Sequence, residues 1–231
     1  GISGGQRREL VGRDIPTLTS LAQMPLPVPF APERGNVESY ERVREQARVR
    51  LEGRSGDRLV HEPILPIEEG LGLCRLPEPS AGDVFFDIEG DAFVGDGGLE
   101  YLLGIISIDE GAPSYKAFWA LNRSEEREAF EALIDFLVER QTEYPDFHVY
   151  HYAPYEPAAL KRLMGRHATR TDELDDLLRN ERFVDLYGVV RQGLRASVES
   201  YSIKDLEPFF GYERELDLKD ANAALVPKEQ L

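Results

Sequence analysis

The chain has 231 residues, of which 42% are hydrophobic and 30% are charged, and its formal net charge at pH 7 is −16. This length and this hydrophobic content suffice for one sizeable α/β domain with a smaller appendage. The charge is uneven, because residues 1–58 carry 10 Lys and Arg against 8 Asp and Glu, whereas the whole chain has 27 and 43. An acidic chain does not adhere to polyanions by bulk electrostatics, so any phosphate contact must be local.

The single cysteine, Cys74, excludes a disulfide framework and a cysteine-rich zinc site within one chain. No apolar stretch approaches the roughly 18–20 residues needed to cross a bilayer, and no signal peptide is visible. We therefore predict a cytoplasmic protein that has no membrane partner.

Residues 1–24 are predicted to form a helical segment with two short helices, over 7–11 and 18–24. Thr17 has the position and side chain of an N-cap for the second helix. A Gly-Ile turn beside short helices resembles half of a helix-hairpin-helix, whose backbone amides can hold DNA phosphates. A plain helical packing unit is the alternative, and the sequence leaves both open.

Residues 25–80 are predicted to be a connector. Four prolines between Pro25 and Pro32 favour extended backbone, and a helix rich in Arg and Glu is expected over 38–51. Further prolines punctuate the chain up to Pro79, so we place a domain boundary near residue 80.

Residues 81–231 are predicted to form the main α/β domain. Alternating and continuous apolar patterns predict strands over 83–88, 100–109, 114–120 and 147–152, and a helix over 124–141. Helices are expected over 157–164, 173–178 and 183–192. This order predicts a mixed sheet flanked by helices, with the first three strands antiparallel neighbours and the fourth parallel beside the first.

The first predicted strand ends in two carboxylates, Asp87 and Glu89. Side chains two apart on a strand share a face and lie about 7 Å apart along it. Such a pair at the end of a buried strand is costly unless a cation neutralises it, and carboxylate oxygens suit Mg²⁺ or Mn²⁺. The alternative is a strand-end pair that only caps a turn.

The fourth strand leads through a short loop into a helix whose first turn carries Glu156, with Pro157 next to it. A carboxylate at this place is also favoured by the helix N-terminus, which alone could explain it.

Together the two motifs resemble the DEDD superfamily of 3′–5′ exonucleases, which have a ribonuclease-H-like fold. Asp87 and Glu89 match its first motif, and the stretch from His151 to Glu156 matches the second, where an Asp is usual in place of Glu156. Residues 184–187 and 201–206 resemble later segments of the superfamily. Residues 85–91, 150–156 and 200–204, together with the lead-in 76–80, are most similar in sequence to bacterial ribonuclease-H-like domains fused behind a RecB-like nuclease domain.

The resemblance implies a metal-dependent nuclease that acts on DNA or RNA with two Mg²⁺ or Mn²⁺ ions. It assigns Asp87, Glu89 and Glu156 as catalytic metal ligands. It also suggests that substrate or ligands are oriented by four further residues, namely His151, Tyr155, Asp185 and Lys204. A non-catalytic nucleic-acid-binding or scaffolding module is the main alternative, and a polymerase or transposase relative fits the second motif less well.

The superfamily's last motif, a Tyr or His followed by an Asp, has no match after Tyr201, because Asp217 and Asp220 lack a Tyr or His at the required spacing. We therefore expect a domain that is truncated before this motif, with three of four metal ligands and little activity. A RecB-like nuclease domain in the same parent chain is the expected partner besides nucleic acid.

Overall fold

The computed structural model describes residues 2–109 and 111–212. Contacts between residues divide the chain into two compact units. The first unit comprises the residues up to Pro63 and those from Leu194 onward, and the second comprises Ile64–Gly193. The domain boundaries at residues 24 and 80 stay predictions, and Asp217 and Asp220 lie outside the described residues.

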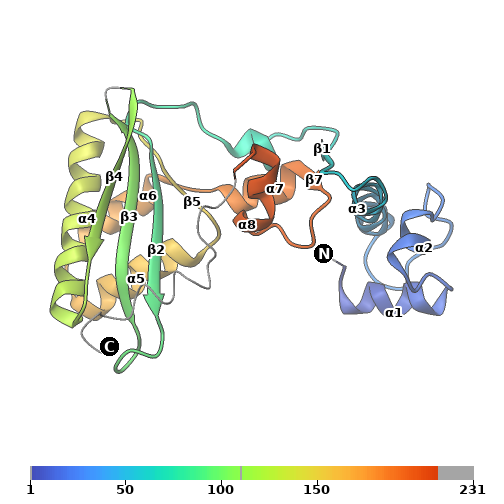
Figure 1. The fold of residues 1–231 in the computed structure, drawn as a ribbon, viewed down its shortest axis with the longest axis horizontal. Helices are drawn as coiled ribbons and strands as arrows, with labels where there is room; N and C mark the ends of the chain where they lie inside the picture. Colours follow the sequence, from blue (N-terminus) through green and yellow to red (C-terminus); the bar gives the residue numbers. More distant parts are fainter. Residues whose placement is uncertain (1, 110, 213–231) are drawn as a thin grey trace. The chain divides into compact units, whose positions relative to one another are not determined.

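A five-stranded mixed sheet forms the centre of the second unit (Figure 1). Its order is β4-β3-β2-β5-β6, with the bounds Ala112–Trp119, Leu99–Asp109, Val84–Asp91, Val149–His151 and Phe183–Asp185. β2, β3 and β4 are antiparallel neighbours, whereas β5 pairs with β2 in parallel. The predicted pairing of the first four strands is confirmed, and the strand that carries Asp87 lies in the middle of the sheet.

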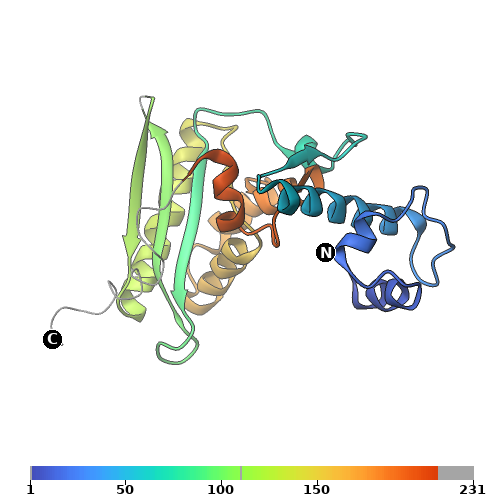
Figure 2. The same cartoon turned by 45° about the vertical axis from the view of Figure 1, so that its right-hand side comes forward.

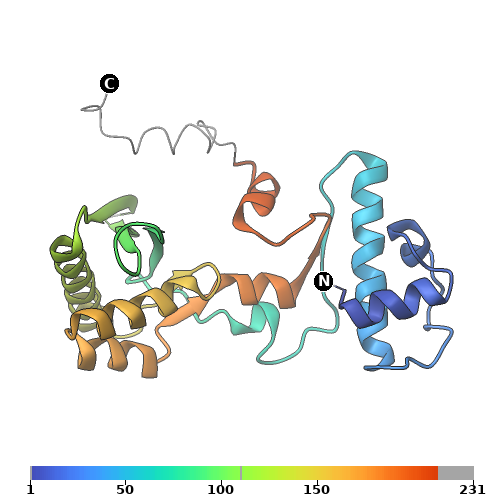
Figure 3. The ribbon, with the colours of Figure 1, turned by 90° about the horizontal axis from the view of Figure 1, so that it is seen from below.

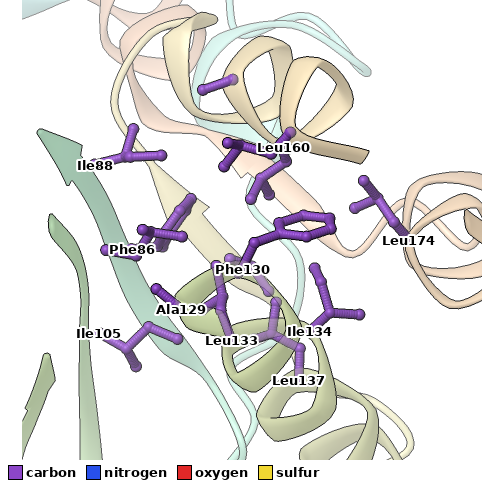
Figure 4. Packing of buried hydrophobic residues seen from close by; sticks show 14 of the residues in the cluster. Phe86, Ile88, Ile105, Ala129, Phe130, Leu133, Ile134, Leu137, Leu160 and Leu174 are labelled. Carbon is purple, nitrogen blue, oxygen red and sulfur yellow. The ribbon is translucent and has the colours of Figure 1, made fainter. Parts of the chain in front are cut away.

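Three helices cover one face of this sheet: α4 (Arg123–Glu143), α5 (Tyr155–His167) and α6 (Thr171–Arg179) (Figures 2 and 3). Alternate residues of β2 point toward them, and Figure 4 shows Phe86 and Ile88 packed against apolar side chains of α4 and α5. The α4 residues of this core recur at helical spacing and are fully buried: Phe130, Leu133, Ile134 and Leu137. This packing leaves the odd-numbered side chains of β2 on the opposite face.

The end of the second unit differs from the prediction. We expected one helix over 183–192, but Phe183–Asp185 forms β6, parallel to β5, and helix α7 covers only Leu186–Gly193. The physical reason is tertiary, because pairing with a buried neighbouring strand outweighs the local helical pattern. The short 3₁₀ helix η1 (Gly72–Arg75) completes this unit.

The first unit contains α1 (Gly4–Gly12), α2 (Leu18–Ala22) and α3 (Val37–Gly56). Two short strands, β1 (His61–Pro63) and β7 (Leu194–Ala196), pair antiparallel, and α8 (Ile203–Leu206) and η2 (Glu207–Phe210) follow. Helices α1, α2 and α3 pack around a small core. Its buried side chains are Leu10, Met24, Val28 and Tyr40. Within the described part of the chain, no helix has the length and apolarity of a membrane span.

Candidate active site

Asp87 and Glu89 project from the face of β2 that the helices do not cover. Val84, Phe86 and Ile88 are buried in the core, so the intervening side chains of this strand face the other way. Asp87 lies opposite Gly104 of β3, which has no side chain. The sequence therefore placed this carboxylate pair on one strand face correctly.

Glu156 lies in the first turn of α5 and is buried, with 5% of its surface exposed. Its Oε2 atom is buried and has no hydrogen-bond partner among the described residues. The nearest basic group is His151 Nδ1, 3.5 Å from Oε2. A carboxylate oxygen in this position lacks the partners that usually offset the loss of water.

The loop between β5 and α5 determines where Glu156 lies. Ala153 has a positive φ of 78°, which is strained for a residue with a Cβ atom. Its carbonyl oxygen lies 2.7 Å from His151 Nδ1, and its N–H donates to Asp185 Oδ1 at 3.0 Å. Since a carbonyl can only accept, Nδ1 of His151 carries a proton in this contact. The N–H of Tyr187 also donates to Asp185 Oδ1, at 2.9 Å.

His151 and Asp185 thus brace the backbone that leads into α5. They lie opposite one another on the paired strands β5 and β6. The sequence predicted substrate or ligand contacts for these two residues, and those roles stay predictions. The bracing contacts could not be read from the sequence, because His151 and Asp185 are far apart in the chain.

Tyr155 is the other residue in this region that was predicted to orient substrate or ligands. It belongs to a cluster of hydrogen-bonded polar side chains. Its hydroxyl donates to Glu100 Oε2 at 2.9 Å, and Arg162 donates to Glu100 Oε1 at 2.7 Å. Glu100 is buried and lies over Gly90, where an added Cβ would stand 2.0 Å from Oε2. The sheet register shifts between Glu89 and Gly90, so a β-bulge interrupts the pairing directly after the two acids, and β2 continues to Asp91.

The charges of Asp87 and Glu156 influence one another. Burial raises the pKa of Asp87, and the nearby charge of Glu156 raises it further, while a backbone hydrogen bond from Ile88 opposes both. Asp87 keeps some exposed surface, but its carboxyl is close enough to Glu156 for repulsion to matter. The structure thus brings a carboxylate of the first predicted motif near that of the second.

Glu89 is not part of a compact ligand cluster. Within residues 2–109 and 111–212, no group of three or more His, Cys, Asp or Glu side chains is arranged to hold a metal ion. Lys204 lies exposed in α8 of the first unit, and its predicted role in substrate binding stays a prediction.

A third buried acid, Glu126, was not predicted from the sequence. It is fully buried and accepts hydrogen bonds from the N–H of Glu100 and from Arg123, Arg166 and His167. Burial would raise the pKa of Glu126, but these hydrogen bonds outweigh it and lower the pKa. Because its partners come from α4, α5 and the start of β3, Glu126 fixes the helix that carries Glu156.

Comparison with known families gives one match. A family model of the RNase H superfamily matches residues 84–228, which include β2, the loop after β5, and α5. The comparisons with curated proteins and with solved structures found no match.

Proposed function

The chain belongs to the RNase H superfamily, and from this membership we propose that it is a metal-dependent nuclease that hydrolyses phosphodiester bonds of DNA or RNA. The superfamily supports nuclease-type activity and nucleic-acid binding in general. The finer part of the proposal is a 3′–5′ exonuclease-like reaction with two divalent ions, as in the DEDD superfamily that the motifs resemble.

The observation that carries the proposal is the unpartnered Oε2 atom of Glu156, buried near the carboxyl of Asp87, which is exposed on the uncovered face of β2. A buried carboxylate oxygen that has no hydrogen bond and lies near a second negative charge destabilises the folded state, and His151 Nδ1, 3.5 Å from this oxygen, donates its proton to a carbonyl instead. A divalent cation removes both costs, since it gives the orphan oxygen a partner and neutralises the repulsion. A purely structural pair would be expected to have an Arg, a Lys or backbone N–H donors in this place.

The donor set fits a hard cation. Carboxylate oxygens are the ligands that Mg²⁺ and Mn²⁺ prefer, and His151 has its Nδ1 proton directed at a carbonyl. We propose that Asp87 and Glu156 hold the ions and that Glu89, on the same strand face as Asp87, completes the ligand set.

Bound ions would supply an activated water and neutralise charge that develops on the phosphate. The residues of the chain keep the ligands in place: His151 and Asp185 fix the loop before α5, and Tyr155 ties the first turn of α5 to Glu100. This support shell has the function of outer-sphere residues in metal sites, which orient the ligands.

The test is release of nucleotides from end-labelled single-stranded and duplex DNA and RNA, in Mn²⁺ and in chelator. We expect slow cleavage that requires Mn²⁺ and is reduced at least about 100-fold by Asp87→Asn and by Glu156→Gln. Glu128→Gln, on the outer surface of α4, is the matched control and should retain full activity. Equal rates in the Asp87 variant and in the control would contradict the proposal.

A second candidate function is a non-catalytic nucleic-acid-binding or scaffolding module. The lack of a three-residue metal cluster among the described residues favours it. It predicts that the folded chain binds nucleic acid but does not cleave it in Mn²⁺. The resemblance of the motifs to RecB-fused domains leads us to propose a RecB-like nuclease domain as partner for either function.

A further inference from the structure

The first unit contains a polar hollow of about 480 Å³ on one side of α1. Three arginines line it: Arg8 and Arg13 from α1 and its C-terminus, and Arg34 from the loop before α3. Gly5 and Gly12 form part of its wall. A Cβ atom at Gly12 would meet nothing within 4 Å, and one at Gly5 only Ser3 Oγ at 3.9 Å. The helix backbone is therefore accessible between the arginine side chains.

Glu9 is one of two acids that line the hollow, and it forms hydrogen bonds to other residues of the first unit. Its carboxylate accepts the Tyr40 hydroxyl at 2.6 Å, the N–H of Glu33 at 3.1 and 3.2 Å, and Arg13 at 3.1 Å. The hydrogen bond from Tyr40 is the main cause of a lowered pKa of Glu9, followed by burial, which opposes it. Glu9 thus fastens α1 to α3 and to the loop that carries Arg34, so the walls of the hollow are held together.

The three arginines differ in how they are held. The guanidinium of Arg13 lies 4.1 Å from the ring centroid of Phe30, and its Nε and Nη2 atoms bind Glu9. This contact fixes its plane and leaves Nη1 without a partner in the described chain. Arg8 and Arg34 are exposed and form no ion pair with any described residue. Two guanidinium groups that form no ion pair therefore stand beside one that is held rigid, and the exposed Glu33 is the second acid that lines the hollow.

We propose that this arginine hollow binds phosphate groups of a nucleic-acid strand. The identity of the ligand rests on the proposed nuclease function, whereas the site itself rests on the cavity and its charges. Guanidinium groups match phosphate oxygens in pairs, and a fixed Arg loses less side-chain entropy on binding than a free one. The chain as a whole is acidic, so a nucleic acid requires a local cationic site of this kind.

Fluorescence anisotropy with labelled single-stranded and duplex oligonucleotides tests the site, with the full chain in chelator so that no cleavage occurs. The test variant is Arg8→Ala with Arg34→Ala. The control is Arg7→Ala with Arg42→Ala, which removes the same charge from two exposed arginines outside the hollow.

We expect the test pair to weaken binding at least about ten-fold, whereas the control pair should change affinity less than about three-fold. The slope of log affinity against log salt concentration should also fall by the equivalent of about two phosphate contacts. Arg8→Lys with Arg34→Lys keeps the charge and should give an intermediate affinity, because a Lys cannot form the paired N–H contacts that an Arg makes with a phosphate. Equal losses in the test and control pairs, or no binding by the wild-type chain, would overturn the site.

Asp87→Asn separates this proposal from the proposed function. In chelator, the loss of oligonucleotide binding on removal of Arg8 and Arg34 should be the same in the Asp87→Asn background as in the wild-type chain. Binding that depends on Arg8 and Arg34, in a chain that never cleaves in Mn²⁺, would support the hollow and refute the nuclease proposal. Cleavage that depends on Asp87, with binding insensitive to Arg8 and Arg34, would refute phosphate binding at the hollow and leave the nuclease proposal standing.

Discussion

At the scale of single residues, Asp87 stabilises the fold less when it is charged than when it is neutral. Burial, and then the charge of Glu156, raise the pKa of Asp87 in the folded state above its value in the unfolded chain. The Asp87 carboxyl group therefore binds its proton more tightly in the folded state than in the unfolded state. Its contribution to stability is full below the unfolded pKa and is lost as the pH rises through the folded pKa. A bound cation would reverse this sign.

Asp87→Asn should therefore stabilise the metal-free protein at neutral pH. Because the side chain keeps contact with water, we expect a modest gain, about 0.5 kcal/mol or a few degrees in the unfolding temperature. Thermal unfolding in chelator measures it, with Glu128→Gln as the control that leaves the temperature unchanged. The gain should shrink at acidic pH, where Asp87 is protonated in both states. An unfolding temperature that falls at neutral pH would contradict the repulsion.

At the scale of elements, the residues at the bulge of β2 connect this strand to α5. Gly90 leaves room for the carboxylate of Glu100, which in turn holds Tyr155 and Arg162. Glu100 is buried, so its carboxylate cannot move away from Gly90 without losing these two partners. The first turn of α5, which carries Glu156, thus depends on a glycine in another element.

Gly90→Ala should destabilise the protein by about 1–3 kcal/mol, because the new Cβ displaces Glu100 from its hydrogen bonds. Denaturant unfolding measures the change. Gly165→Ala is the matched control, because a Cβ there meets nothing within 4 Å on the exposed side of α5, and it should stabilise by up to about 1 kcal/mol. In a Glu100→Ala background, Gly90→Ala should lose most of its effect, and an undiminished effect would contradict the role of Glu100.

The elements also show what could be predicted from the sequence. The pattern of β2, with Val84, Phe86 and Ile88 alternating with the acids, was sufficient to place Asp87 on the correct face. β6 was missed because three residues carry too little periodicity to distinguish a strand from the start of a helix. Glu100 and Glu126 were missed because most of their partners lie far away in the sequence, so that only the folded chain shows their burial and hydrogen bonds.

At the scale of the whole molecule, the two units differ in the chemistry that they offer. The sheet unit carries the acids Asp87, Glu89 and Glu156, and the first unit carries the arginine hollow around Arg8 and Arg34. Acids alone would repel a polyanion, so the proposed cations at the sheet and the proposed phosphate site at the arginines would each offset this repulsion. The family match supports the class of reaction, while the choice between DNA and RNA was not accessible from the motifs.

The most direct test of the account is a calorimetric titration of the wild-type chain with Mn²⁺ at neutral pH, beside Asp87→Asn, Glu156→Gln and the control Glu128→Gln. We predict that the wild-type chain and the control bind Mn²⁺ with the same affinity. Each of the other two variants should bind at least about ten-fold more weakly, because each loses one of the two proposed carboxylate ligands. Equal Mn²⁺ binding by all four proteins, or no binding by the wild-type chain, would contradict the proposed metal site.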